Sequence, residues 1–178
     1  MLAAASRREQ WAIAGLFRAY QPLLLRYLRA QAPAAADDLA GEVWVAVARG
    51  LHRFAGDEAC FRAWLFTIAR RRLTDHRRKV GRRRTDPVPH ESLDRLDSDA
   101  LDPATIAVDH IRAQQAVELI MADLSADQAD AVLLRVVAGL DVADVARIMG
   151  RSPGAVRVLC HRALRRLAPL LVEGVLAE

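Results

Sequence analysis

Two Arg residues and a His residue are spaced four apart near the C-terminal end of the chain, at Arg157, His161 and Arg165. In an α-helix this spacing places the three side chains on one face, with Val158 and Arg162 beside them. An α-helix fits the DNA major groove, and an Arg guanidinium can donate two hydrogen bonds to a guanine edge. The pattern therefore indicates recognition of nucleic acid by one helix. The alternative explanation is a solvated basic face on an ordinary helical bundle.

A second basic cluster lies in residues 61–84, which hold ten basic side chains against a single carboxylate, Asp75. Clustered basic side chains attract phosphate groups and release their counterions. Aromatic rings on a basic face can stack on unpaired bases. Trp64, however, has Leu65 as its neighbour and is expected in the core. The segment predicts a second nucleic-acid surface, although a solvated charged face explains its composition equally well.

Catalytic centres are not indicated by the remaining polar residues. No His has metal-ligand spacing with another His, a Cys or paired carboxylates, and none lies beside a candidate nucleophile. The glycines form no phosphate-binding loop. We therefore expect no catalytic residues, no metal and no cofactor. The five His residues considered are His52, His76, His90, His110 and His161.

Composition excludes several other classes of protein. Hydrophobic residues make up 53% of the 178 residues and charged residues 27%, which supports a buried core. No apolar run approaches the roughly 20 residues of a membrane span. The first ten residues lack the apolar core of a signal peptide, so we expect a cytoplasmic protein. Cys60 and Cys160 cannot form a disulfide scaffold, and we expect both to be small buried residues.

The charge pattern divides the chain. The formal net charge of +4 hides a basic segment over residues 61–84 and an acidic one over residues 85–130, which has two basic and eleven acidic side chains. The richness in Ala, Leu and Arg favours helix over sheet. We predict an all-α fold with two small helical domains at residues 11–84 and 106–172. An acidic, proline-containing linker at residues 85–105 is expected to be flexible.

The first domain is predicted to contain helices near residues 11–30, 37–54 and 58–80. Pro22 either kinks the first helix or begins a new one, and Asp37 or Asp38 can cap the next. Apolar residues recur at helical spacing in each segment. The predicted inward residues are Ile13, Leu16, Phe17, Tyr20, Leu24, Tyr27 and Leu28, then Leu39, Val43, Val47, Leu51 and Phe54, then Phe61, Leu65, Ile68 and Leu73.

The second domain shows the start and stop signals of a helix-turn-helix. Ser125 and Gln128 form a capping box. Gly139 ends the helix that follows, Asp141 caps a short helix that stops at Gly150, and a third helix starts at Pro153 after its cap, Ser152. The face of this last helix predicted to be buried comprises Val156, Leu159, Cys160, Ala163, Leu164 and Leu167.

Several stretches resemble bacterial RNA polymerase sigma factors of the sigma-70 superfamily, in the extracytoplasmic-function (ECF) group. Residues 38–44, DLAGEVW, resemble region 2.2 and residues 61–70, FRAWLFTIAR, resemble region 2.3. Residues 75–78, DHRR, resemble the start of region 2.4. Residues 124–128, 132–135, 139–140, 145–146, 154–157 and 161–167 follow region 4. The resemblance extends from about Phe17 to Leu171, and the order and spacing of the stretches make it specific.

The resemblance implies a promoter-recognition subunit without catalytic activity of its own. Its first domain would bind the beta-prime clamp helices of core RNA polymerase and open the −10 element of the promoter. Its second domain would bind the −35 element and the beta flap. A cognate anti-sigma factor is expected as a regulator.

The resemblance also assigns residues to these contacts. The core polymerase contacts are Asp38, Glu42, Arg49 and Arg53. The −10 contacts are Arg70, Arg71, Asp75, His76, Arg77 and Arg78. The −35 contacts are Arg151, Ser152, Arg157, Val158, His161, Arg162 and Arg165.

The sequence departs from the family pattern at two positions. Gly41 replaces the usual Gln, which we expect to weaken the polymerase contact and the helix. Arg71 replaces a frequent Asn near the site of base capture. We expect no added sensory domain after Val172.

Two other classes of function remain open. A helix-turn-helix regulator with a helical sensory or dimerisation domain predicts a homodimer on a palindromic site. An adaptor that binds only protein predicts contacts that are indifferent to salt.

Overall fold

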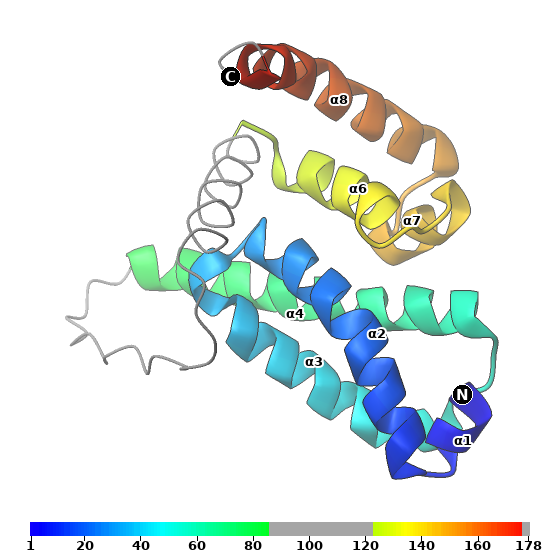
Figure 1. Cartoon of the computed structure of the whole chain (residues 1–178). Coiled ribbons are helices and arrows are strands. Elements are labelled where there is room, and N and C mark those ends of the chain that lie inside the picture. The colour runs from blue at the N-terminus through cyan, green and yellow to red at the C-terminus, as the bar shows by residue number, and fades with distance from the viewer. Residues whose placement is uncertain (86–122, 176–178) are drawn as a thin grey trace.

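The computed structural model describes residues 1–85 and 123–175, and all regular elements in these ranges are helices (Figure 1). Residues 86–122 include the predicted linker and the first part of the second domain, so these predictions lie outside the described residues. The elements are α1 (Leu2–Ser6), α2 (Gln10–Arg29), η1 (Pro33–Ala35), α3 (Ala36–Gly50), η2 (Leu51–Arg53), α4 (Glu58–Thr85), α6 (Ala126–Val136), α7 (Val142–Met149) and α8 (Pro153–Val175).

Helices α2, α3 and α4 pack together as the first lobe, with the short α1 against the N-terminal end of α2. Pro22 lies inside α2, so residues 10–29 form one helix and no second helix begins there. The helical spacing of apolar residues correctly predicts the buried face of α2 at Leu24, Tyr27 and Leu28. Ile13 and Phe17 were predicted to be buried in the same face, but they are exposed. Both residues lie in the N-terminal half of α2, where α1 and α3 leave one side of the helix uncovered.

An aromatic cluster fixes the start of α4 against the rest of the first lobe. Phe61 is fully buried, and its ring meets Tyr20 edge-on at 5.2 Å and Phe54 at 5.6 Å. Trp64 stacks on Phe54 at 5.2 Å, which agrees with its predicted place in the core. Such ring pairs add about 1 kcal/mol each beyond the area they bury. They hold the long helix α4 in a fixed position across the lobe.

Helix α4 begins at a side-chain cap that the sequence did not reveal. Asp57 Oδ1 accepts a hydrogen bond from the Cys60 backbone N–H at 2.8 Å. This bond lowers the pKa of the Asp57 carboxyl, since it favours the charged form. The predicted cap of α3 is wrong, because Asp37 and Asp38 lie within its first turn and η1 leads into it. Cys60 was predicted to be buried but is exposed beside this cap.

The Asp57 cap predicts a pH dependence of stability. A carboxyl whose pKa is lowered by folding stabilises the protein above its unfolded pKa, and this contribution is lost as the pH falls through the folded pKa. We expect the melting temperature of the wild-type protein to fall more steeply below about pH 4 than that of Asp57→Asn, which keeps an acceptor but does not titrate. Thermal melts followed by circular dichroism measure both. Parallel curves would contradict this role of Asp57.

The second lobe consists of α6, α7 and α8 and is a helix-turn-helix with the predicted caps. Ser125 and Gln128 form the capping box of α6, and the Asp141 side chain accepts from the Asp144 N–H at 2.7 Å to begin α7. Gly150 ends α7 with φ +63°, a left-handed conformation that favours glycine. These local signals set the turn that precedes α8.

The buried face of α8 is narrower than predicted. Val156, Ala163 and Leu167 are buried, while Leu159 and Cys160 are half-buried. Leu164 was predicted to be buried but is 53% exposed. Among the described residues, α6 and α7 make the main contacts with α8, and they cover one side of the helix.

The two lobes pack against each other through α4. In Figure 1, α6 and α7 lie between α4 on one side and α8 on the other. Contacts between α4 and α7 and a hydrogen bond between Tyr27 of α2 and Asp130 of α6 join the lobes. The outer face of α8 therefore points away from the first lobe.

Candidate nucleic-acid interface

The outer face of α8 carries the basic residues that the sequence predicts for DNA recognition. Arg157, Val158, His161, Arg162 and Arg165 are all exposed. Because their spacing places them on adjacent parts of one helix surface, they form a continuous basic face of a size that fits a major groove. The structure therefore brings these five predicted residues together.

Two other predicted DNA contacts lie at the start of α8. The Ser152 hydroxyl accepts from the Ala155 N–H at 3.2 Å and so caps the helix. Arg151 forms an ion pair with Asp127 of α6 at 2.6 Å. The Arg151 and Asp127 side chains are both accessible to solvent. Salt therefore screens their attraction, and the ion pair adds little to the stability of the fold. Breaking this ion pair so that Arg151 can contact a phosphate instead would therefore cost little free energy.

The predicted −10 residues of α4 separate onto two sides of the helix. Arg71 and Arg78 are exposed, and Asp75 pairs with Arg78 at 3.8 Å. His76 lies with Asp75 and Arg78 at a polar cleft of about 230 Å³ between α3 and α4. The cleft lining has a basic excess, which suits phosphate groups. It comprises Leu39, Glu42, Arg72, Asp75, His76, Arg78, Lys79 and Arg82.

Arg70 and Arg77, by contrast, point toward the second lobe. Arg70 Nε donates to Asp130 Oδ2 at 2.8 Å, and Arg77 Nη1 lies 3.9 Å from Asp130 Oδ1. Tyr27 Oη donates to the same Oδ1 at 2.9 Å. We call Tyr27, Arg70, Arg77 and Asp130 the Asp130 cluster. The structure thus divides the predicted −10 set into an accessible group and a group that contacts α6.

The hydroxyl of Tyr27 is firmly protonated in this arrangement. Burial raises the pKa of Tyr27 well above its usual range, and the charge of Asp130 raises it further. Both effects disfavour a second negative charge next to the carboxylate. Tyr27 therefore acts as a hydrogen-bond donor to Asp130 across the physiological pH range.

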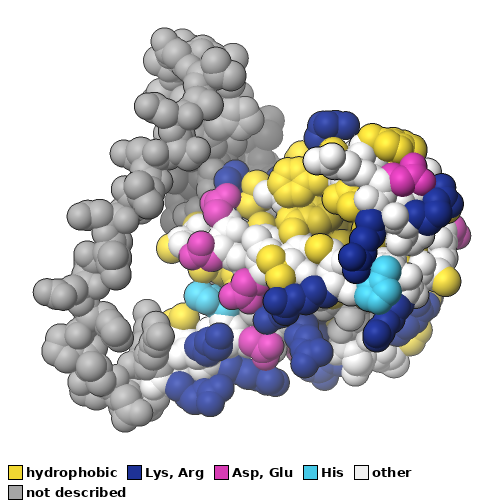
Figure 2. Space-filling view, turned by 90° about the horizontal axis from the view of Figure 1, so that it is seen from below, with side chains coloured by type: hydrophobic (Ala, Val, Ile, Leu, Met, Phe, Trp, Pro, Cys, Tyr) yellow, Lys and Arg dark blue, Asp and Glu magenta, His cyan; other side chains and the backbone are white. Residues whose placement is uncertain are grey.

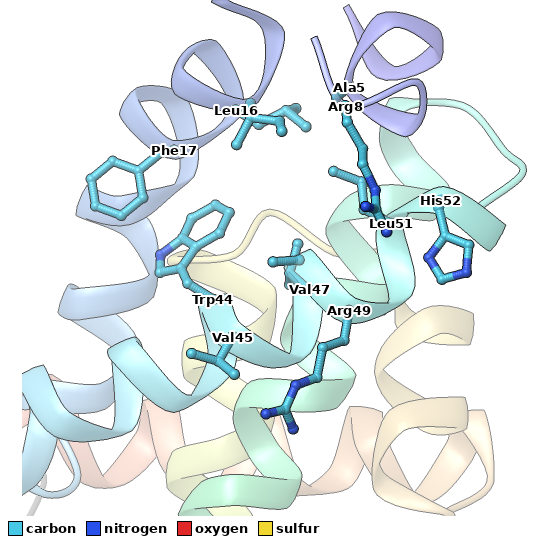
Figure 3. Close-up of a pocket in the computed structure, with 12 residues that line it drawn as sticks. Ala5, Arg8, Leu16, Phe17, Trp44, Val45, Val47, Arg49, Leu51 and His52 are labelled. Carbon is cyan, nitrogen blue, oxygen red and sulfur yellow. The ribbon is translucent and has the colours of Figure 1, made fainter. Parts of the chain in front are cut away.

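A separate apolar groove of about 630 Å³ lies between α1, α2 and α3. Figure 3 shows Phe17 and Trp44 on one side of it and Arg8 and Leu51 on the other. The Phe17 and Trp44 rings are 5.1 Å apart. Val45 of α3 is 50% exposed at its margin. Exposed apolar patches rimmed by polar groups commonly mark protein-binding surfaces.

Basic side chains border this apolar groove. Figure 2 shows hydrophobic side chains gathered on the underside of the molecule with Lys, Arg and His side chains close to them. Arg8, Arg49 and His52 are among the residues that line the groove. A partner that fits it would present an apolar helix face with acidic residues beside it.

The predicted polymerase contacts lie along the exposed side of α3 and just after it. Asp38, Glu42, Arg49 and Arg53 are all exposed. Glu42 pairs with Arg72 of α4 at 3.3 Å, which links this surface to the polar cleft. Arg49 lines the apolar groove, whereas Arg53 lies in η2.

Sequence reasoning missed the apolar part of this surface. Phe17, Trp44 and Val45 line the groove, yet the helical pattern assigned Phe17 to the core and gave the other two no role. A signal was present, because residues 43–48 are all apolar. Such a run covers every side of a helix, and one core can bury only one side.

Comparisons with known proteins identify two matched regions. The family model of sigma-70 region 2 matches residues 16–83, and that of sigma-70 region 4 matches residues 114–167. The first includes α2 from residue 16, α3, and α4 as far as residue 83, and the second includes α6, α7 and α8 as far as residue 167. Both basic surfaces and the apolar groove thus lie within or next to the matched regions.

Curated relatives match over most of the chain. ECF RNA polymerase sigma factor ShbA of Streptomyces griseus is 36% identical over 157 residues, covering 84% of this chain and 82% of the relative. ECF RNA polymerase sigma factor SigD of Mycobacterium tuberculosis is 34% identical over 181 residues, covering 98% and 84%.

A solved structure has a similar fold. It contains the sigma factor RpoE in complex with the anti-sigma factor NepR from Bartonella quintana. The TM-score is 0.67 at 26% identity, and the match covers 89% of this chain and 95% of that one. Among the residues described, no helix has the length and apolarity required to cross a membrane.

Proposed function

The chain belongs to the sigma-70 family of RNA polymerase sigma factors, in its ECF group, and from this premise we propose how its surfaces divide the work of promoter recognition. It binds core RNA polymerase and directs initiation at promoters with a −10 and a −35 element. Members of this family are transcription factors and not enzymes. We propose that this chain has no catalytic activity of its own and acts in the cytoplasm with the polymerase.

We assign the domains as the sequence predicts them. Residues 11–84 form region 2, residues 106–172 form region 4, and residues 85–105 form the acidic linker. The five Asp residues and one Glu residue in this linker would let it occupy a basic channel that otherwise holds nucleic acid. The two matched family regions, separated by residues 84–113, support this division.

The first lobe is proposed to dock on the beta-prime clamp helices. The exposed side of α3 offers Asp38, Glu42 and Arg49, and η2 adds Arg53. Arg49 also lines the apolar groove, and burial of the groove residues would supply the non-directional part of the binding energy. The charged residues would set the orientation of the docked helices.

The two basic surfaces are proposed to bind the promoter. The α4 surface takes the melted −10 element, and its proposed contacts are Arg70, Arg71, Asp75, His76, Arg77 and Arg78. The α8 surface takes the −35 element, and its proposed contacts are Arg151, Ser152, Arg157, Val158, His161, Arg162 and Arg165. The second lobe also meets the beta flap in this proposal.

Regulation by an anti-sigma factor is the remaining part of the proposal. The structural neighbour RpoE is a sigma factor in complex with the anti-sigma factor NepR. Similarity at 26% identity over most of both chains supports the same type of partner here. The anti-sigma factor would act by covering surfaces that the polymerase or the promoter requires.

One observation carries the proposal more than any other. The chain presents a basic helix-turn-helix face on α8 and a separate apolar groove on α1, α2 and α3, on different lobes. A regulator that binds DNA alone does not need the second surface, whereas a subunit that recognises DNA while bound to a larger machine needs both.

Co-purification with core polymerase tests this assignment. Tagged full-length protein mixed with purified core enzyme is expected to elute with it, and light scattering of the protein alone is expected to give a monomer. A stable homodimer that protects a palindromic site without polymerase would contradict the assignment. That result would favour the helix-turn-helix regulator instead.

A further inference from the structure

A buried carboxylate lies where the two lobes meet. Asp130 of α6 is 1% exposed, and it is the one charged side chain in the buried class among residues 1–82 and 123–169. Burial of a carboxylate is unfavourable unless the charge is paired and hydrogen-bonded. All side-chain partners that the structure gives Asp130 come from the first lobe.

The partners of Asp130 satisfy both of its oxygens. Oδ1 accepts from Tyr27 Oη at 2.9 Å and lies 3.9 Å from Arg77 Nη1. Oδ2 accepts from Arg70 Nε at 2.8 Å. The guanidinium of Arg70 also donates to the Ile148 carbonyl of α7 at 3.3 Å. One carboxylate therefore joins α2, α4 and α6, while Arg70 extends the contact to α7.

A second contact between the lobes carries a cost. The Arg62 guanidinium lies against the turn between α6 and α7, which contains Gly139. If Gly139 carried a Cβ atom, that atom would lie 3.3 Å from Arg62 Nη1. Arg62 Nε is buried without a hydrogen-bond partner. An unsatisfied buried donor is unfavourable, so the burial of Arg62 Nε costs free energy in this arrangement.

We propose that the Asp130 cluster holds the free chain in a closed form in which Asp130 takes the place of nucleic acid on α4. The inference rests on the proposed function, which assigns Arg70 and Arg77 to the −10 element. A carboxylate and a phosphate offer similar acceptors to a guanidinium. Opening of the lobes frees Arg70 from Asp130 and removes the ion pair between Arg77 and Asp130, while Arg77 keeps its hydrogen bond to Gln31 Oε1 in the first lobe at 2.6 Å. The cluster therefore couples domain separation to exposure of this DNA surface.

The span of a promoter requires this opening. Elements centred at −10 and −35 are about 25 base pairs apart, or roughly 85 Å along the duplex axis at about 3.4 Å per base pair. A compact chain of this length has a radius of gyration of about 16 Å and so a diameter of about 40 Å. The closed form cannot place α4 and α8 on both elements.

The closed form affects the two DNA surfaces unequally. The basic face of α8 is exposed in it, while Arg70 and Arg77 are engaged by Asp130. The effect of opening should therefore be measured with a ligand of the α4 surface. A single-stranded oligonucleotide is such a probe, because the −10 element is bound in its melted form.

Charge-matched variants of the full-length chain test the proposal. Asp130→Asn removes the buried charge, and Asp123→Asn removes one carboxylate at an exposed position as a control. We expect a larger radius of gyration by small-angle X-ray scattering for Asp130→Asn only. We also expect it to bind a fluorescein-labelled, mixed-sequence single strand of about 20 nucleotides at least about fivefold more tightly than Asp123→Asn, because apparent affinity follows the open fraction.

A second variant excludes a general charge effect. Tyr27→Phe keeps the net charge and the ring within the first lobe but deletes the hydrogen bond to Asp130. We expect it to change both measurements in the same direction, with an affinity gain of about twofold or more. Circular dichroism reports whether each variant folds. If Asp130→Asn loses its helical signal, Tyr27→Phe decides the test.

The outcomes separate this inference from the proposed function. Unchanged scattering for the folded variants would overturn the closed form. Larger radii without tighter binding would overturn the claim that Asp130 masks the DNA surface. Scattering does not depend on DNA or polymerase, so a failure of the sigma-factor assignment would leave the test of the closed form intact.

Discussion

Replacing Val45 with glutamate is expected to abolish co-purification of the protein with core RNA polymerase. Val45 is half exposed on α3 at the margin of the apolar groove. Burial of an unpaired carboxylate in an apolar interface costs several kcal/mol. A loss of about 3 kcal/mol weakens binding by more than about a hundredfold. The dissociation constant measured by fluorescence anisotropy with labelled protein and core enzyme gives the size of the effect.

Val80→Glu is the matched control for this experiment. Val80 is an exposed valine of α4 in the same lobe and does not line the groove. Because the substitution is chemically identical, any general effect of a new carboxylate will be the same in both variants. Equal affinity of the two variants for core polymerase would show that the groove is not a docking surface.

Truncating Arg157 to alanine is expected to reduce promoter-dependent transcription about tenfold to a hundredfold. Arg157 is exposed on α8 in the centre of the predicted recognition face. A bidentate contact between Arg and guanine is worth about 1–3 kcal/mol of discrimination. Quantitative run-off transcription measures the loss when the core enzyme is saturated with the protein and the holoenzyme is below saturation of the promoter, since core binding by the first lobe is unaffected.

The template distinguishes base recognition from a general loss of charge. On a promoter whose −35 element has been replaced, Arg157→Ala and wild type should differ little, because the recognised bases are absent. Arg26→Ala removes the same charge from the exposed surface of α2 and should behave as wild type on both templates. An equal loss on the intact and replaced −35 templates would mean that Arg157 contacts only the DNA backbone.

The fold of the second lobe could be predicted because its signals are local. A capping box at Ser125, an aspartate cap at Asp141 and a left-handed Gly150 each act over a few residues. The contact between Asp130 and Arg70 joins residues 60 positions apart. No pattern within α6 marks Asp130 as buried, because its partners belong to another part of the chain.

The charged residues of the candidate site could be predicted from the sequence, but its apolar residues could not. Charged residues on α3, α4 and α8 stand out in a sequence because they interrupt an apolar pattern. An exposed Val45 or Phe17 has the same sequence signature as a core residue. What separates the two is which neighbouring helices cover them, and this depends on the packing of α1, α2 and α3.

The division of the −10 residues depends on tertiary structure in the same way. Arg70 and Arg77 are seven residues apart and share one side of α4, while Arg71 and Arg78 share the next. Helical spacing alone therefore separates these pairs. Only the position of α6 shows that the first pair faces a carboxylate and the second faces solvent.

The central claim is that this chain gives core polymerase its choice of promoter, and start-site mapping tests it most directly. Core enzyme with and without the full-length protein is used for run-off transcription of a genomic fragment library, and the RNA 5′ ends are sequenced. The account predicts new start sites that appear only with the protein and share two sequence elements at fixed distances upstream. The same start sites with and without the protein, despite a demonstrated complex with core polymerase, would contradict it.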